Sequence, residues 1–458
     1  MEQLENVGRR TAAKKLAGGY AEIRAAIAGA TAPSGRGSEA RKNRRRERAL
    51  TDLQFFAETY FPHYLAAPPS KMHLALYETY QRAIAGNAAL LECNASPRCR
   101  QGREALHSIN GSGPSASPPP PCKGGRGDSP SASAPASGTL AGARIAEAAP
   151  RGNAKSTLTT LILPLWCVVG RRRRFIGILS DTTEQAAEFL EFIKAELETN
   201  ERLNLDFPSA CGEGPVWKTG HAVTANGVKI KSWGKRKRIR GARHGAARPD
   251  LVICDDLEDD EHIGSPEQRE KDRSWFFRAL MKIGARNTVY IVVGTLLHYD
   301  SLLARLLKQP GWTGRKWRAV IKYSASPLWQ EWENLYAGHG PARMEEENQI
   351  PLNPPLLKGD GKDPPCKGGQ GGILQGGENL LPPGRGKDGM GVETSSHISP
   401  ADAFFEAHKT EMLAGTEVLW PEVEDYHYLM KMRVGEGPAF FDSEKQNEPI
   451  NPNDCLFQ

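Results

Sequence analysis

Nine residues organise this chain: Ala149-Pro150-Arg151-Gly152-Asn153-Ala154-Lys155-Ser156-Thr157. They follow a short apolar-rich run and open the apolar run 158–169, so the expected context is a strand, a tight loop and a helix. There, a Lys followed by Ser or Thr is typical of a phosphate-binding loop, whose backbone N–H groups cradle phosphates while the Lys ammonium reaches the terminal ones. The usual pattern is G-x-x-x-x-G-K-S/T, and alanines replace both glycines. An ordinary strand-to-helix turn is therefore the alternative at this stage.

The composition indicates a globular core diluted by low-complexity segments. Only 39% of the 458 residues are hydrophobic, while Gly and Pro number 47 and 33. Two stretches, 92–141 and 346–397, share the short repeat Pro-Cys-Lys-Gly-Gly and are too poor in apolar residues to order themselves. We interpret them as related insertions at surface loops, where added length costs little free energy. A disordered interaction segment is the alternative.

The net charge of +6 lies mostly in residues 1–50, which hold 12 Lys or Arg and 5 Asp or Glu. A basic arm of this kind is a common nucleic-acid contact, although a solvated tail has the same composition. A second basic run comes just before an acidic strand. The candidate nucleic-acid contacts in the two runs are Arg44, Arg45, Arg46, Lys235, Arg236, Lys237, Arg238 and Arg240.

No segment resembles a signal peptide, and the run 158–169 is too short to span a bilayer. The eight cysteines include no C-x-x-C pair. We therefore expect reduced thiols, a cytoplasmic location and no membrane partner.

The rest of the chain alternates like an α/β protein. Residues 51–91 read as lead-in helices, 142–345 as the core, and 398–458 as the end of the same domain. Helices are predicted over 182–198 and after the capping box Ser265-Pro266-Glu267-Gln268. The predicted strands are 144–148, 175–179, 251–254, 289–293 and 317–321. This pattern predicts a mostly parallel sheet flanked by helices, with ligands at the carboxyl ends of the strands.

Two of these strands end in groups that suit phosphate chemistry. Leu251-Val252-Ile253-Cys254 runs into Asp255 and Asp256, with Glu258 two residues on, which is what a Walker B segment needs. Asp255 fits the Mg²⁺ role, while either Asp256 or Glu258 is placed to orient the attacking water. The strand 289–293 ends in Gly294-Thr295, whose hydroxyl is expected near the γ-phosphate. Solvated loop acids and a simple turn are the bland alternatives.

Four segments in this order resemble the large terminase subunit of tailed bacteriophages. They are Pro150–Thr157, Arg248–Glu258, Val293–Leu303 and Phe441–Ile450. In that family Ala commonly precedes the Lys, so the missing glycine loses its weight as an objection. The resemblance implies an ASCE-type P-loop ATPase that packages viral double-stranded DNA into a procapsid.

The family's functional residues carry over position by position. Lys155 would hold the β- and γ-phosphates of ATP, Ser156 and Asp255 the Mg²⁺, and Asp256 would take the place of the catalytic carboxylate. Arg151 matches the loop arginine that senses or stabilises the γ-phosphate, and Gly294 with Thr295 matches the coupling motif. The nucleotide-binding set is Pro150, Arg151, Gly152, Asn153, Ala154, Lys155, Ser156 and Thr157. The implied partners are DNA, a small terminase subunit, the portal protein and further copies in a ring, in the cytoplasm of a bacterial host.

The chain departs from the family pattern in its two insertions and at its end. It stops at Gln458, about where an RNase H-like nuclease would begin, so we expect an ATPase part without the endonuclease. An inactive prophage remnant that only binds DNA, or another P-loop nucleic-acid translocase, are the alternative functions.

Overall fold

The computed structural model describes residues 21–31, 38–85, 142–338 and 399–450. The predicted insertions lie entirely outside these residues, as does much of the basic arm. The chain divides into two compact units. The first comprises residues 1–319, 419–424 and 439–458, and the second comprises 320–418 and 425–438. Two short C-terminal segments thus return to the first unit.

The first unit is built on an eight-stranded, mostly parallel sheet in the order β3-β4-β5-β2-β6-β7-β1-β8. Only β3–β4 and β4–β5 pair antiparallel. The strand β7 lies between β1, which leads into the phosphate loop, and the acidic strand β6. This is the ASCE-type arrangement of P-loop NTPases, and the predicted fold class is confirmed. The strands are β1 (Arg144–Ala148), β2 (Phe175–Ser180), β3 (Val216–Lys218), β4 (His221–Val223), β5 (Lys229–Gly234), β6 (Leu251–Asp255), β7 (Val289–Gly294) and β8 (Thr313–Lys316).

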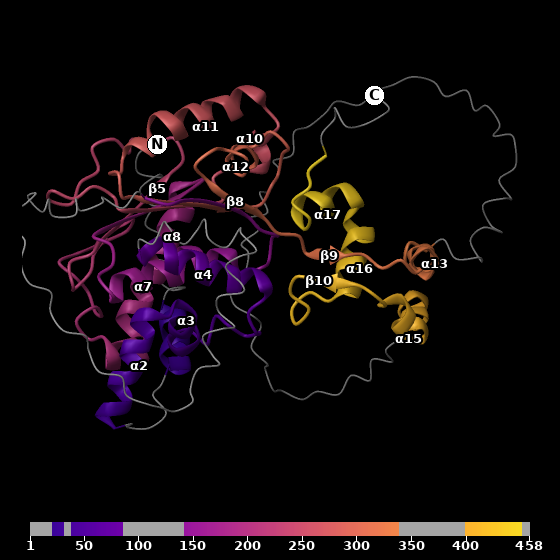
Figure 1. The fold of residues 1–458 in the computed structure, drawn as a ribbon, viewed down its shortest axis with the longest axis horizontal. Coiled ribbons are helices and arrows are strands. Elements are labelled where there is room, and N and C mark those ends of the chain that lie inside the picture. Colours follow the sequence, from indigo (N-terminus) through magenta and orange to yellow (C-terminus); the bar gives the residue numbers. More distant parts are fainter. Residues whose placement is uncertain (1–20, 32–37, 86–141, 339–398, 451–458) are drawn as a thin grey trace, which may run out of the picture. The chain divides into compact units, whose positions relative to one another are not determined.

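Helices cover both faces of this sheet, as Figure 1 shows. Every residue of β2, β6 and β7 is buried, which in a parallel sheet requires cover on both sides. One face packs against α2 (Glu39–Thr51), α3 (Leu53–Tyr60), α4 (Lys71–Ala85), α7 (Leu163–Val169), α8 (Thr183–Thr199) and α9 (Glu201–Asp206). The other packs against α11 (Pro266–Arg278), η4 (Leu280–Lys282) and α12 (Leu302–Leu306), with α10 (Asp260–Ile263) just before them.

The predicted helix starts are confirmed. Thr182 caps α8 by accepting a hydrogen bond from the Gln185 N–H, and Ser265 caps α11 by accepting one from Gln268. Each cap satisfies one of the amide groups that the first turn of a helix leaves unpaired.

The predicted strand 317–321 is wrong for its first three residues, and its last two, Val320 and Ile321, belong to the short strand β9 (Val320–Lys322) outside this sheet. The chain instead forms β8 at Thr313–Lys316, beside β1, and then leaves the sheet. β8 is an edge strand with mostly exposed side chains, so it carries no apolar signal. After β8, Ala319 and Val320 are buried, whereas Trp317 is half-buried and Ile321 is exposed. Ala319 donates its N–H to the Lys445 carbonyl of the returning C-terminal segment.

The second unit is small. Its strands β9 (Val320–Lys322) and β10 (Glu417–Val418) pair antiparallel, and its helices are α13 (Leu328–Tyr336), α15 (Pro400–Met412) and α16 (Tyr426–Glu436). An aromatic cluster forms its core, with the Phe405 and His427 rings stacked 3.7 Å apart and Trp329 packed edge-on to Trp332. The helix α17 (Pro438–Glu444) leads from it back to the first unit.

Across the described residues, no helix has the length and apolar content needed to cross a membrane. The three cysteines among them, Cys167, Cys211 and Cys254, are free thiols.

Candidate active site

The predicted phosphate loop, residues 149–157, leaves β1 and enters a helix that starts at Lys155, passes through a π-helical segment, Thr157–Ile162, and continues as α7. Its two alanines stand in different conformations. Ala149 simply extends β1, because its N–H donates to the Gly294 carbonyl. Ala154 has φ 51°, in the left-handed region where a Cβ costs about 1–2 kcal/mol, and Gly152 has φ 84°. The missing glycine therefore matters only at position 154.

The buried side chain of His73 contacts the backbone of the loop. The His73 Nδ1 accepts a hydrogen bond from the Ser70 N–H at 3.1 Å, which leaves Nε2 protonated to donate to the Asn153 carbonyl at 3.0 Å. Burial lowers the pKa of His73 to about 4, so the ring is neutral in the folded protein. No sequence pattern indicates this contact, because an isolated His belongs to no motif.

We expect His73 to make the protein less stable in mild acid. Its pKa is lower in the folded chain than in the unfolded one, so protons bind the unfolded state first as the pH falls below about 6.5. Between pH 7 and pH 5 this costs about 2 kcal/mol. Urea unfolding of the wild type and of His73→Gln, which keeps a donor for Asn153, should show a smaller acid loss in the variant. An equal loss in both would contradict the assignment.

The acidic strand β6 delivers its last residue to the loop. The Asp255 carboxylate is 1% exposed and accepts hydrogen bonds from the hydroxyls of Ser156, at 3.0 Å, and Thr160, at 2.5 Å. Burial, helped by the neighbouring charge of Asp256, raises the pKa of Asp255 to about 7. Among the described residues there is no group of three or more His, Cys, Asp or Glu suited to a metal ion. Mg²⁺ with a nucleotide needs only one or two protein oxygens beside the phosphates, so the pair Ser156 and Asp255 fits it.

The lysine of the loop faces the other predicted residues. Its side chain is 8% exposed, its Nζ lies 3.5 Å from Asp256 Oδ2, and it donates to the Thr295 hydroxyl at 3.3 Å. The Thr295 hydroxyl in turn donates to the Ala149 carbonyl, at the start of the loop. The Lys155 ammonium thus contacts the residues that directly follow β6 and β7. Asp256 itself has φ 44°, in the left-handed region.

The two carboxylates that the sequence left open differ in surroundings. Both oxygens of Glu258 accept backbone N–H groups at the start of α12, from Leu302 at 2.6 Å and Leu303 at 3.1 Å. Burial raises the pKa of Glu258 to about 7. Asp256 is instead partly exposed and faces Lys155. The geometry therefore favours Asp256 as the group that orients water, with Glu258 shaping the loop behind it.

The arginine of the loop is held by acids on its outer side. The Arg151 Nε lies 3.0 Å from Glu444 Oε2, and a terminal nitrogen lies 3.8 Å from Asp260 Oδ2. Its guanidinium remains partly exposed.

Residues from the C-terminal segments complete the loop's surroundings, and sequence reasoning missed them. The Lys445 Nζ donates to the Arg151 carbonyl at 2.7 Å and to Glu424 at 2.5 Å, and the other oxygen of Glu424 accepts from Asn153 at 3.0 Å. The Asn447 side chain accepts the Leu296 N–H just beyond Thr295. The only available signal was the run Phe441–Ile450, which supported the resemblance without a role for any residue.

A cavity of about 390 Å³ borders the loop at Ala154 and Leu158. Its volume lies in the range of small-molecule sites. Its walls are mainly apolar and aromatic, including Tyr64, Tyr77, His73, Trp420 and the prolines at 68 and 69. The Trp420 ring packs edge-on against His73, and its N–H donates to the Pro68 carbonyl.

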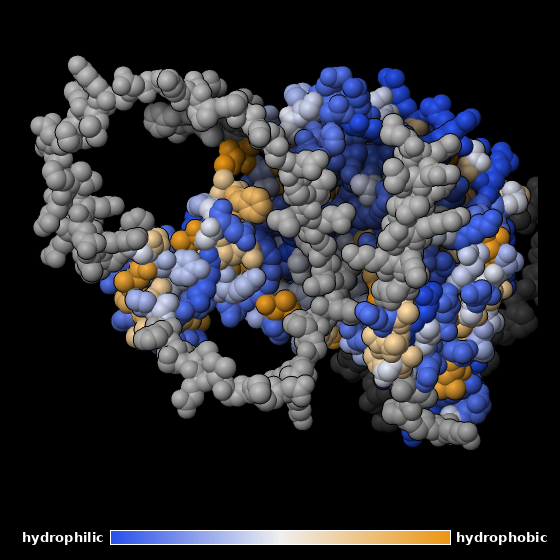
Figure 2. All heavy atoms as spheres, turned by 180° about the vertical axis from the view of Figure 1, so that it is seen from behind, coloured by the Kyte–Doolittle hydropathy of each residue, from blue (hydrophilic) through white to orange (hydrophobic). Residues whose placement is uncertain are grey.

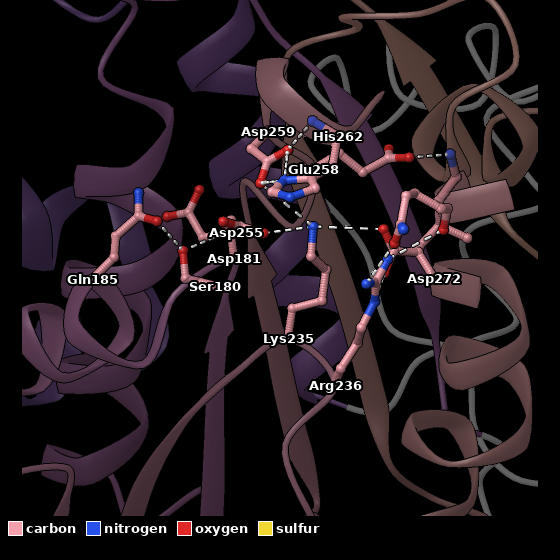
Figure 3. Close-up of polar contacts among 12 residues, drawn as sticks. Ser180, Asp181, Gln185, Lys235, Arg236, Asp255, Glu258, Asp259, His262 and Asp272 are labelled. Atoms are coloured by element: carbon pink, nitrogen blue, oxygen red, sulfur yellow. Dashed lines mark hydrogen bonds and ion pairs between the residues drawn. The ribbon is translucent and has the colours of Figure 1, made fainter. Parts of the chain in front are cut away.

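Beside the acidic strand lies an ionic cluster, drawn in Figure 3. Lys235 follows β5, is only 9% exposed, and points between Asp181, at 2.5 Å, and Asp272, at 3.5 Å. Arg236 donates to Asp272 at 2.6 Å and to Gln268 at 2.8 Å. These two predicted nucleic-acid contacts are therefore used inside the protein.

The other predicted nucleic-acid residues differ in exposure. Arg46 is half-buried, with its guanidinium 5.8 Å from the centre of the Phe207 ring. Arg45 forms a bidentate ion pair with the fully buried Asp206, so it anchors α2. The exposed residues are Arg44, Lys237, Arg238 and Arg240.

No protein-family model matches the chain, and no curated protein matches it in sequence. Among solved structures, the chain is similar to the ATPase domain of the large terminase of Thermus phage P74-26, in an arginine-to-alanine mutant. The match covers 45% of this chain and 84% of that chain, with 13% identity and a TM-score of 0.29. Similarity this low supports no statement about function, so any function has to follow from the residues of the site. By its sheet order and its phosphate loop, the fold is that of a P-loop NTPase.

Proposed function

We propose that this chain is an ATPase of the large terminase kind, which uses ATP hydrolysis to move viral double-stranded DNA into a procapsid. One observation carries the enzymatic part. The neighbouring parallel strands β6, β7 and β1 end at the same edge of the sheet. Side chains of the kind that phosphoryl transfer needs lie close together there, namely Lys155, Ser156, Asp255, Asp256 and Thr295. The DNA-packaging part rests on the order of the four sequence segments.

The roles follow from charge and position. The loop N–H groups and Lys155 would bind the β- and γ-phosphates, and Ser156 with Asp255 would hold Mg²⁺, which neutralises charge on those oxygens. Asp256 would orient a water towards the γ-phosphorus. A bond then forms from that water oxygen to phosphorus while the bond to the bridging oxygen of ADP breaks. Arg151 would leave Glu444 to meet the charge that develops on the γ-phosphate.

We assign the aromatic cavity to the base of the nucleotide. It borders the phosphate loop, and its flat side chains suit a purine ring. Trp420→Ala is expected to raise the Kd for Mg·ATP by about tenfold or more, because stacking of one base on an aromatic ring is worth about 1–3 kcal/mol. Titration with a fluorescent ATP analogue measures this. Trp420→Phe should recover most of the affinity, and competition by inorganic tripolyphosphate should be unchanged. If Trp420→Ala weakened the binding of tripolyphosphate as much as the binding of Mg·ATP, Trp420 would not contact the base.

The partners proposed with this function are DNA, a small terminase subunit, the portal protein and further copies of the chain in a ring. The deciding experiment is phosphate release by the purified chain with and without linear duplex DNA. We expect turnover that DNA stimulates and that Asp256→Asn lowers by at least about a hundredfold. Salt-sensitive DNA binding with no turnover and no measurable affinity for Mg·ATP would instead identify an inactive remnant.

A further inference from the structure

The β3–β5 region carries an unusual run of charge. Residues 215–249 contain ten Lys or Arg and two His, and no Asp or Glu. Lys235 and Arg236 are consumed by the ionic cluster beside β6. Within the described part of the chain, none of the other eight forms an ion pair with a carboxylate. These eight are Lys218, Lys229, Lys231, Lys237, Arg238, Arg240, Arg243 and Arg248.

Strand pairing gathers part of this charge on one face. His221 lies opposite Lys231 across β4 and β5, and Lys218 lies opposite His221 across β3 and β4. Lys229 is two residues from Lys231 and shares its face, since side chains alternate along a strand. The opposite face is apolar, with Ala222 and Ile230 fully buried.

The connection from β5 to β6 adds its own cations to this face. Lys229 Nζ donates to the Arg243 carbonyl at 2.7 Å, and the His244 ring lies 3.1 Å from the Gly227 carbonyl in the β4–β5 turn. The connection therefore runs back from the ATP-site end of β5 to the other end of the strand. We call the combined set, Lys218, His221, Lys229, Lys231, Arg243 and His244, the hairpin surface.

The charges on the hairpin surface repel one another. The pKa of His221 is lowered by burial and then by Lys229, Lys231, Lys218 and His244, and the pKa of Lys229 is lowered by burial and by Lys231. A ligand with several negative charges would relieve this repulsion. The chain's exposed large apolar side chains, among the described residues, include none between 215 and 249. A membrane would therefore find no apolar anchor here, whereas a nucleic-acid backbone needs only cations.

We propose that the hairpin surface binds the phosphate backbone of double-stranded DNA without reading its sequence. The choice of DNA as the polyanion rests on the proposed function, while the phosphate-binding chemistry rests on the surface itself. The same connection begins at Lys235, whose ammonium reaches Asp181 and, at 4.0 Å, Asp259 beside the Walker B acids. DNA bound along it would thus contact a segment anchored at the ATP site.

The test is DNA binding by the full chain, measured as fluorescence anisotropy of a labelled duplex over a salt series. The combined variant Lys229→Gln, Lys231→Gln, Arg243→Gln should bind at least about tenfold more weakly, with the slope of log K against log salt reduced by about 3. The matched control is Lys271→Gln, Arg305→Gln, Lys409→Gln. It loses the same charge, but its cations already pair with Glu267, Asp300 and Glu406. The control should bind like the wild type.

Equal weakening in both variants, or no weakening in the first, would overturn the proposal. Loss of binding to anionic lipid vesicles with unchanged DNA binding would overturn the choice of partner. If the combined variant fails to fold, Lys218→Gln with Arg243→Gln, the two exposed basic residues of the hairpin surface, should lower the slope by about 2. DNA binding is measured without ATP. A wild type that hydrolyses ATP but does not bind DNA would therefore contradict only the DNA-binding role of the hairpin surface. A wild type that binds DNA but never hydrolyses ATP would refute only the enzymatic proposal.

Discussion

Lys155→Ala is expected to lower the rate of phosphate release from ATP by about a hundredfold to a thousandfold. The Lys155 ammonium lies beside Asp256 and Thr295 and is largely buried. In such a poorly solvated position its charge would act strongly on the phosphate being transferred. Its removal also leaves Asp256 without its counter-charge. Phosphate release with saturating Mg·ATP, with and without duplex DNA, measures the effect.

The control for Lys155 is Lys194→Met. Lys194 is another buried lysine, but it pairs with Glu191 within α8 and faces no part of the phosphate loop. It should retain turnover if the variant folds, which circular dichroism reports. Unchanged turnover in Lys155→Ala would sink the assignment of the site and with it the proposed ATPase.

Arg315→Ala is expected to give the largest loss of stability, about 3–5 kcal/mol. Glu147 lies on β1, two residues before the loop, with no exposed surface. Its carboxylate accepts three hydrogen bonds from the Arg315 guanidinium, at 2.6, 2.9 and 3.2 Å, and one from the Trp317 indole at 3.0 Å. Removing the arginine leaves a buried carboxylate without its cation, and that charge is costly in a poorly solvated site.

The pH dependence of this variant has a definite sign. Burial already raises the pKa of Glu147, and loss of Arg315 raises it further. A carboxyl group with a raised folded pKa costs stability above its unfolded pKa, so the deficit should shrink as the pH is lowered. Urea unfolding at neutral and acid pH checks this. The exposed pair of Arg305 and Asp300 is the control, and Arg305→Ala should cost less than about 1 kcal/mol. Equal losses in the two variants would contradict the argument.

The fold follows largely from apolar patterning. The strands at 175–180, 251–255 and 289–294 are buried on both faces, so each reads as a nearly continuous apolar run. β1 is buried apart from Arg144, but Glu147 interrupts its apolar run. β3, β4 and β8 are short edge or near-edge strands without such a run. β3 and β4 pair with the strands next to them in the chain, whereas the position of β8 depends on pairing with β1, which is distant in sequence.

The candidate site divides in the same way. The residues that lie at strand ends, Lys155, Asp255, Asp256 and Thr295, could be found because parallel strands end at one edge of a sheet. Glu258 and Lys235 look like catalytic and nucleic-acid residues by position, yet one caps α12 and the other is enclosed by aspartates. Such roles depend on partners that the local pattern does not contain.

For the predicted phosphate loop, the order of strand, loop and helix and the chemistry of Lys155 and Ser156 can be read from neighbours along the chain. The conformations of Ala149 and Ala154, the contact of His73 with the Asn153 carbonyl, and the contacts of Lys445 and Glu424 on the outer side appear only in the folded protein. These contacts join the loop to residues about 80 to 300 positions away along the chain. Their energy comes from burial and hydrogen bonding that exist only after the chain has folded.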